Sequence, residues 1–255
     1  MKRTILTGIV ILTAGLSGLL AQQPAAPAAA KGPTIKSPAE RQAVLAVQSA
    51  TDPDTAIKAS EDLLNKFADT DYKEFALTME ARAYQQKKDD VNAQVYGERV
   101  LQINPKAYLM QLLVAEVITP NIKEHDLDHD KEVANVTQLF NDAIVNAKAA
   151  VKPNPQLSDA DWTAALAYTI AEAHNGLGML AQIQKKWDDA IKEYQLAVDG
   201  DPEQDAYSTR LASAYLGAGK NAEAVAICDK LLAKPNLHPT IKQVVTNLKT
   251  QASKK

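Results

Sequence analysis

The stretch WDDAIKEYQLAVDGDP at residues 187–202 recurs in outline as NAEAVAICDKLLAKPN at residues 221–236. Ala190 and Ala224 hold the same place in the two stretches, 34 residues apart, and each lies near the start of a helical run. A period of this length, made of two helices and the turn between them, is typical of solenoids whose helix pairs stack on their neighbours. We therefore expect an all-α repeat protein that functions by binding a partner.

The alanine of this period recurs upstream, each time with a proline about twelve residues after it. Proline lacks the N–H that a helix interior needs and biases the preceding residue away from α geometry, so these prolines end helices. A small residue at the alanine position lets two paired helices cross closely. The pairs are Ala93 and Pro105, Ala143 and Pro155, Ala190 and Pro202, and, one residue short, Ala224 and Pro235.

The first helix of the last unit carries a large apolar residue, a small one and an aromatic one at Leu211, Ala212 and Tyr215. Together with the 34-residue period, this pattern resembles the tetratricopeptide repeat (TPR) family, over roughly residues 39–236. The resemblance implies a right-handed α-solenoid of TPR-like helix pairs. A last helix with a polar outer face, at residues 242–255, would cap the array.

The centre of the chain departs from the period. Ala93 and Ala143 are 50 residues apart, and Ala143 and Ala190 are 47 residues apart, so we expect insertions in both central units. The apolar periodicity and the start and stop signals predict eleven helices. They are expected at 39–50, 53–67, 72–87, 89–103, 106–118, 130–151, 158–185, 187–199, 203–217, 221–233 and 239–252.

The N-terminus has the pattern of a secretory signal. Two basic residues precede an apolar run at 5–20, and a small residue, Ala21, follows it. We expect a signal peptide at 1–21, a flexible Pro/Ala-rich linker at 22–38 and a helical repeat domain at 39–255. A retained membrane anchor is the alternative for the first segment.

Composition narrows the class of protein. The net charge of −3 is too small to indicate a nucleic-acid partner. Cys228 is the only cysteine, which excludes lipid attachment at the signal and an intrachain disulfide. We expect an exported bacterial-type protein, periplasmic or secreted, that needs no cofactor.

The resemblance also implies where a partner would bind, because TPR arrays normally bind in a concave groove lined by their first helices. Families that clamp a C-terminal carboxylate use lysine, asparagine and arginine there, and only Arg210 and Asn175 match, so the full clamp is absent. Each residue has a second interpretation as part of an ordinary solvated helix face. The groove candidates are Arg82, Gln85, Asn175, Met179, Gln182, Arg210 and Ser213.

The segment KEHDLDHDKE at 123–132 is a weak metal candidate. His125 and His129 are spaced i, i+4, but a zinc site needs about three protein ligands, and acidic residues also favour a helix N-terminus. Cys228 and His174 are predicted to pack in the core, and Trp187 to bridge the turn between paired helices.

Three functions remain open. The favoured one is an exported TPR adaptor that binds a peptide or protein partner through its groove and has no enzymatic activity. The second is a structural envelope subunit that self-associates. The third is a metal-dependent enzyme that uses the insertion at 119–131. A membrane would be a partner only if the N-terminal segment were retained as an anchor.

Overall fold

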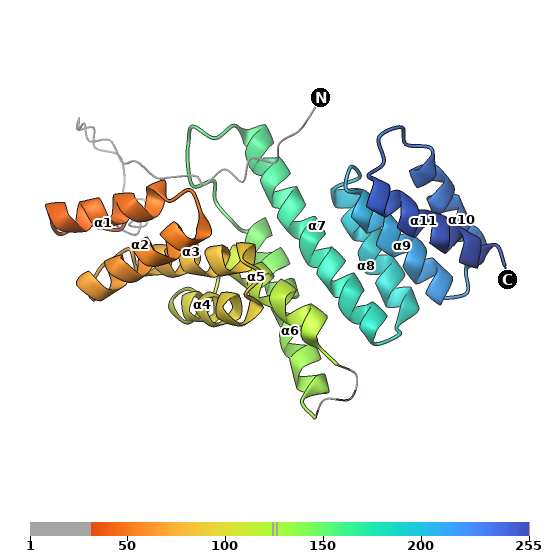
Figure 1. The fold of residues 1–255 in the computed structure, drawn as a ribbon, viewed down its shortest axis with the longest axis horizontal. Helices are drawn as coiled ribbons and strands as arrows, with labels where there is room; N and C mark the ends of the chain where they lie inside the picture. The colour runs from red at the N-terminus through yellow and green to blue at the C-terminus, as the bar shows by residue number, and fades with distance from the viewer. Residues whose placement is uncertain (1–31, 124, 126, 255) are drawn as a thin grey trace, which may run out of the picture.

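The computed structural model describes residues 32–123, 125 and 127–254, and the regular elements in this part of the chain are all helices (Figure 1). Consecutive helices pack as antiparallel pairs, which confirms the predicted all-α solenoid of TPR-like units. The predicted signal segment and most of the predicted linker lie outside the described residues. The helices are α1 (Pro38–Ser49), α2 (Pro53–Lys66), α3 (Lys73–Gln86), α4 (Asp90–Ile103), α5 (Tyr108–Ile118), the 3-10 helix η1 (Thr119–Asn121), α6 (His129–Lys148), α7 (Asp159–Ile183), α8 (Trp187–Gly200), α9 (Asp205–Gly217), α10 (Asn221–Leu232) and α11 (Pro239–Ala252).

Helix ends follow local chemistry. Asp52 caps α2 by accepting a hydrogen bond from the Thr55 amide, and Pro53 occupies the first helical turn. Ser158 caps α7 in the same way through the amide of Asp161. The predicted boundaries therefore agree with the observed ones to within a few residues, the largest difference being the end of α6 at Lys148 rather than at residue 151.

Three of the turns inside helix pairs share one backbone geometry. Lys88, Lys185 and Gly219 have φ values of 59°, 58° and 74°, in the left-handed region. At each, the amide of the following residue bonds to a carbonyl five residues back, as in Lys220 N to Tyr215 O at 2.9 Å. Lys185 and Gly219 are 34 residues apart, so the period seen in the sequence is a period of turns as well as of helices.

The four alanines of the repeat pattern lie where paired helices touch. Ala93, Ala143, Ala190 and Ala224 are all 0% exposed, whereas Ala222, two residues from the last of them, is exposed. The small side chain thus marks the contact inside each pair.

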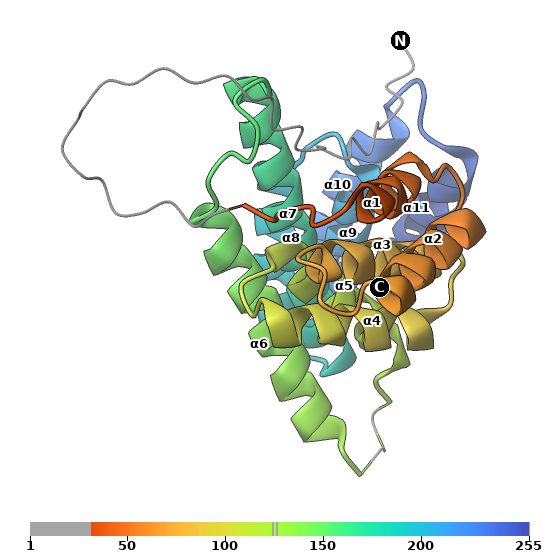
Figure 2. The same cartoon turned by 90° about the vertical axis from the view of Figure 1, so that its left-hand side faces the viewer.

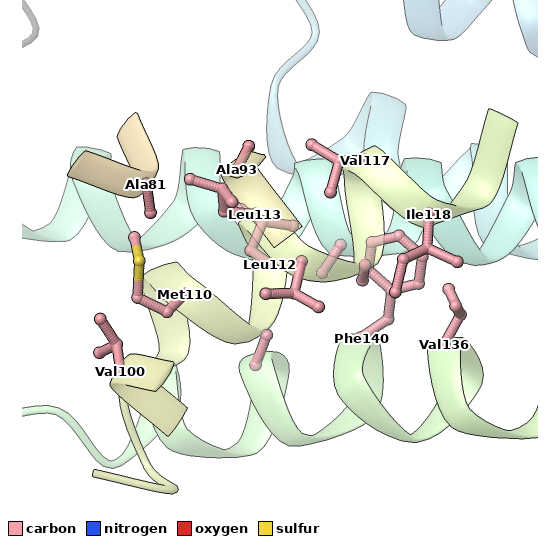
Figure 3. Packing of buried hydrophobic residues seen from close by; sticks show 14 of the residues in the cluster. Ala81, Ala93, Val100, Met110, Leu112, Leu113, Val117, Ile118, Val136 and Phe140 are labelled. Atoms are coloured by element: carbon pink, nitrogen blue, oxygen red, sulfur yellow. The ribbon is translucent and has the colours of Figure 1, made fainter. Parts of the chain in front are cut away.

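The central core surrounds α5, which packs on α3, α4, α6 and α7. Figure 3 shows Phe140 and Val136 of α6 next to Ile118 of α5. Phe140 is 0% exposed, and its ring fills the space left by a glycine on α7, because a Cβ atom at Gly176 would lie 2.1 Å from Phe140 Cζ. This contact joins α6 to α7.

Helix α7 is the longest element and belongs to both halves. It packs on α5 and α6 on one side and on α8 on the other, and in Figure 1 it runs between α1–α6 and α8–α11. Figure 2 shows α6 and α7 along the same edge of the molecule. The insertions expected in the centre therefore extend α6 and α7 rather than forming a separate domain. At the C-terminal end α11 packs on both α9 and α10, as expected for a cap. Across the residues that the structure describes, no helix combines the length and the apolar character needed to span a bilayer.

Candidate peptide-binding face

Side chains from four successive first helices, α3, α5, α7 and α9, meet in one connected row. Gln85 Nε2 on α3 donates to Glu116 Oε2 on α5 at 3.3 Å. The carboxylate of Glu172 on α7 acts electrostatically on Glu116. Asn175 Nδ2, also on α7, donates to Glu172 Oε2 at 3.3 Å, and Arg210 Nη1 on α9 donates to Asn175 Oδ1 at 2.9 Å. We call these five residues the inner polar row.

The inner polar row passes through the central units, where the chain departs from the repeat spacing. The central units carry insertions, so their first helices need not present a face in line with those on either side. Hydrogen bonds link α3 to α5 and α7 to α9, and the Glu172 carboxylate acts electrostatically on Glu116 between α5 and α7. The first helices thus share one polar surface through the irregular centre.

Glu116 has the strongest electrostatic perturbation of the row. Burial raises the pKa of its carboxyl to about 8, and the nearby Glu172 carboxylate contributes to this rise, while the hydrogen bond from Gln85 acts in the opposite sense. Its carboxyl therefore carries a proton over much of the neutral range. Glu172 forms no ion pair within the described residues, and neither does Glu116.

Two tyrosines border Glu172. Tyr168 Oη, one turn earlier on α7, donates to Glu172 Oε1 at 3.2 Å, and the Tyr168 side chain is 43% exposed. Tyr207 on α9 is only 1% exposed. Burial raises the pKa of Tyr207 above its usual range, and the Glu172 carboxylate adds to this through its charge and through a side-chain hydrogen bond.

Three of the predicted groove residues, Gln85, Asn175 and Arg210, are members of the inner polar row. A fourth, Arg82 on α3, is partly buried and lies apart from it: burial lowers the pKa of its guanidinium, and its electrostatic neighbour is Tyr108. Arg82 lines a hollow of about 150 Å³ between α3 and the α1–α2 turn.

The other predicted groove residues serve packing or stay unassigned. Met179 packs against the buried cluster of Ala190, Tyr194 and Leu211. Gln182 accepts a hydrogen bond from Tyr194 Oη at 3.0 Å, which fixes α7 against α8. Ser213 is partly exposed on α9. Their role in binding a partner stays a prediction.

The described residues of the segment 123–132 lead into α6, which begins at His129. His125 is exposed, and His129 Nδ1 lies 3.0 Å from the Lys123 carbonyl oxygen at the start of the helix. Among the residues that the structure describes, no three His, Cys, Asp or Glu side chains are grouped as a metal site needs.

The residues predicted to be structural have identifiable contacts. Cys228 is buried in the cluster with Ala212, Leu231 and Val245, and burial raises the pKa of its thiol. His174 is not simply packed: its Nδ1 lies 2.8 Å from Glu193 Oε2 on α8. Trp187 covers the α9 backbone, since a Cβ atom at Gly217 would lie 2.5 Å from its ring.

Sequence reasoning missed four members of the site: Glu116, Tyr168, Glu172 and Tyr207. Glu116 lies on α5, whose unit departs from the period, so no repeat register assigned it to a face. Glu172 lies one turn before Asn175 on the same helix, and a search for carboxylates at i−3 from the groove candidates would have found it.

Comparisons with known proteins agree with the fold. Residues 124–228, about two fifths of the chain, match the family model of the plant-specific mitochondrial import receptor subunit TOM20. A comparison with curated protein sequences gives no match.

Solved structures of similar fold are TPR proteins and a protein named MamA. A thermophilic TPR protein from Thermus thermophilus has a TM-score of 0.54 and 17% identity over 82% of this chain and 98% of that one. MamA from Desulfovibrio magneticus RS-1 has a TM-score of 0.52 and 14% identity over 82% of this chain and 94% of that one. At these identities the likeness shows the fold, and the TPR-like architecture expected from the sequence is confirmed.

The family match corrects the predicted location. The apolar N-terminal run led us to expect an exported bacterial-type protein, periplasmic or secreted. The matching model describes a subunit of a mitochondrial import receptor, which is not an exported protein. The run at 5–20 is a short-range pattern, and such a pattern does not by itself distinguish a secretory signal from other apolar N-terminal segments.

Proposed function

We propose that this protein is a non-enzymatic scaffold that binds an extended peptide segment of a protein partner along its inner polar row. The observation that carries the proposal is the continuity of the row from Gln85 on α3 to Arg210 on α9. Amide, carboxylate and guanidinium groups arranged in this way offer donors and acceptors to a peptide backbone and to its side chains.

Several features favour binding over catalysis. Cys228 is buried in an apolar cluster, and His174 is paired with Glu193, so neither is presented together with a nucleophile or base. The most perturbed carboxyl of the face, Glu116, has an amide and a second carboxylate as its neighbours. The match of residues 124–228 to an import receptor subunit also supports a receptor-like role, since it spans α6, α7, α8, α9 and most of α10.

A peptide library displayed on phage tests the proposal. Peptides selected on the wild-type protein are measured against the double variant Gln85→Ala with Arg210→Ala, in which the two ends of the row are removed. We expect these peptides to bind at least about tenfold more weakly, because hydrogen bonds to charged groups are among the stronger polar contacts.

The control is the double variant Gln94→Ala with Gln138→Ala, which removes two side-chain amides from the second helices α4 and α6, outside the inner polar row. Equal binding by both double variants, with unchanged melting temperatures, would contradict the proposal. Light scattering over a concentration series distinguishes the structural alternative: oligomers that grow with concentration and ignore the Gln85→Ala and Arg210→Ala changes would favour self-assembly.

A further inference from the structure

We propose that Arg82 and the hollow beside it form a second binding site, which takes a carboxylate group from a polypeptide partner. The carboxylate belongs either to an aspartate or glutamate side chain or to a C-terminus, which share this chemistry. The site lies apart from the inner polar row, so the inference goes beyond the proposed function and stands or falls on its own.

The first argument is a guanidinium without a counter-ion. Arg82 is partly buried on α3, and burial lowers the pKa of its guanidinium, which still stays charged at neutral pH. Within the described part of the chain, no carboxylate pairs with Arg82 and no group hydrogen-bonds to it. Its electrostatic neighbour, Tyr108, is neutral at neutral pH, since burial raises the pKa of its phenol. Because buried charges are normally paired, an anion beside Arg82 would be stabilised.

The carboxylates nearest to the hollow have partners of their own. Asp52 lines the hollow, and as the cap of α2 it accepts hydrogen bonds from the amide and the hydroxyl of Thr55 at 2.9 and 2.6 Å. Asp54, in the first turn of α2, pairs with Lys87. Neither carboxylate is therefore available to neutralise Arg82.

The second argument is the lining of the hollow, which lies where α3 faces the turn between α1 and α2, at one end of the molecule (Figure 1). Thr51 and Gln86 contribute a hydroxyl and a side-chain amide, and among the described residues neither side chain has a hydrogen-bond partner. The rest of the lining is apolar, with Met79, Pro53 and three alanines at 50, 56 and 83. This combination suits a carboxylate on an aliphatic stem.

The charge of the lining favours a carboxylate over a phosphate. The N–H fork of arginine can donate two parallel hydrogen bonds to either anion. However, a phosphate group carries up to two negative charges at neutral pH, and Arg82 is the single basic residue in the lining, where Asp52 is also present. A carboxylate brings one charge, which the guanidinium balances.

The size of the hollow favours one group of a larger partner over a whole small molecule. Pockets that enclose small molecules usually have volumes of about 300–1,000 Å³. The hollow has about 150 Å³, so it admits a single side chain or chain terminus. The rest of the ligand must then lie outside it, on the surface of α3 and the α1–α2 turn, as a polypeptide would.

The test follows the full chain by NMR with 15N-labelled protein. The chain has five arginines, so loss of one Nε–Hε signal in Arg82→Gln identifies the signal of Arg82. The probes are inorganic phosphate and three short acetylated peptides: one with glutamate and an amidated C-terminus, the same peptide with glutamine, and the glutamine peptide with a free C-terminus. We expect a saturable shift of the Arg82 signal with a carboxylate peptide and none with the amidated glutamine peptide. The two carboxylate peptides distinguish a side chain from a C-terminus.

Matched variants test the role of the guanidinium, with the backbone amide of Thr51 as the reporter. Arg82→Gln should weaken the carboxylate peptide at least about tenfold, as for a charge-assisted contact, and Arg82→Lys, which keeps the charge but loses the fork, by about threefold. Arg41→Gln, which removes an exposed arginine from α1, should change the affinity less than about twofold. Arg82→Gln should not lower the melting temperature, because it removes an unpaired charge. A lower melting temperature with unchanged affinity would overturn the site.

The remaining outcomes separate the site from charge and from the scaffold. Equal weakening by Arg82→Gln and Arg41→Gln would mean attraction by net charge alone, and tighter binding of phosphate than of either carboxylate peptide would overturn the assignment to a carboxylate. If Gln85→Ala with Arg210→Ala weakens the carboxylate peptide as much as Arg82→Gln does, the hollow is not a separate site and the inference falls. If that double variant affects neither this peptide nor the phage-selected ones, the proposed function fails and the Arg82 site stands.

Discussion

The central unit and the last full unit of the array use the same helix-pair plan with different packing. In α5, eight of the eleven residues are buried, whereas in α9 four of the thirteen are. Helix α5 is enclosed by α3, α4, α6 and α7, so it is apolar on nearly every side; α9 packs on α8, α10 and α11 through fewer buried residues. The comparison teaches that a repeat period predicts a helix's neighbours only where the array is regular.

The two units also differ in what fills their contacts. The centre depends on one large ring, Phe140, set against a glycine of α7. The C-terminal units depend on small residues such as Ala190 and Ala224 at close helix crossings. Loss of volume should therefore damage the centre, and gain of volume should damage either unit.

The largest effect is expected from Phe140→Ala in the central unit. The substitution leaves a cavity between α6 and α7 and should lower the free energy of unfolding by about 3–5 kcal/mol. Chemical denaturation measures it, with Val145→Ala on the same helix as the control, because Val145 is 63% exposed. Similar losses in the two variants would show that α6 is not packed as described.

Overpacking at the repeat alanines comes next. Ala143→Leu in the centre and Ala224→Leu near the C-terminus should each cost about 1–3 kcal/mol, since both positions are buried between paired helices. Ala222→Leu, at an exposed position of α10, should have little effect. If the melting temperatures of Ala224→Leu and Ala222→Leu agree, the repeat register is wrong; if only Ala143→Leu is tolerated, the centre lacks the common crossing.

A pH series tests the titration of Glu116 in the central unit. The pKa of Glu116 is about 8 in the folded protein, above the ordinary glutamate value of 4.5, so its contribution to stability is full below pH 4.5 and is lost as the pH rises toward 8. Glu116→Gln should remove this loss, which is at most about 1.4 kcal/mol per pH unit.

The control for that series is Glu223→Gln, which removes an exposed carboxylate from α10. Some slope should remain in Glu116→Gln, because burial also raises the pKa of Glu80 on α3, to about 7. Parallel stability curves for wild-type and Glu116→Gln between pH 5 and 8 would contradict the assignment of a buried, protonated Glu116.

The smallest effect is expected in the turns. Lys88 adopts a left-handed backbone where the equivalent turn near the C-terminus has Gly219. Lys88→Gly should raise the free energy of unfolding by roughly 0.5–1 kcal/mol, and Gly219→Ala should lower it by about 1 kcal/mol. Thermal melts of the two variants check the signs. A destabilising Lys88→Gly would mean that the lysine side chain stabilises its turn by more than the backbone strain costs.

The sequence predicted the helices well because their signals are local. Prolines, caps and apolar spacing act within a few residues, and they placed the start of α2 at Pro53 and the start of α8 at Trp187 correctly. The candidate site was only partly predictable. Asn175 and Arg210 followed from the period, but Glu116 depends on how α5 lies against α7, which no local pattern encodes. Likewise, the role of Met179 in packing follows from its neighbours on α8 and α9.

The connection between α6 and α7 is a place where the chain could be cut into two fragments. It lies between Lys148 and Asp159, carries the exposed Val151, and joins two helices that already hold each other through Phe140 and the backbone of α7. A cut in this connection would leave Gln85 and Glu116 on one fragment and Glu172, Asn175 and Arg210 on the other. Reassembly of the fragments would then bring these residues together again, and under the proposed function a bound peptide would stabilise the reassembled pair.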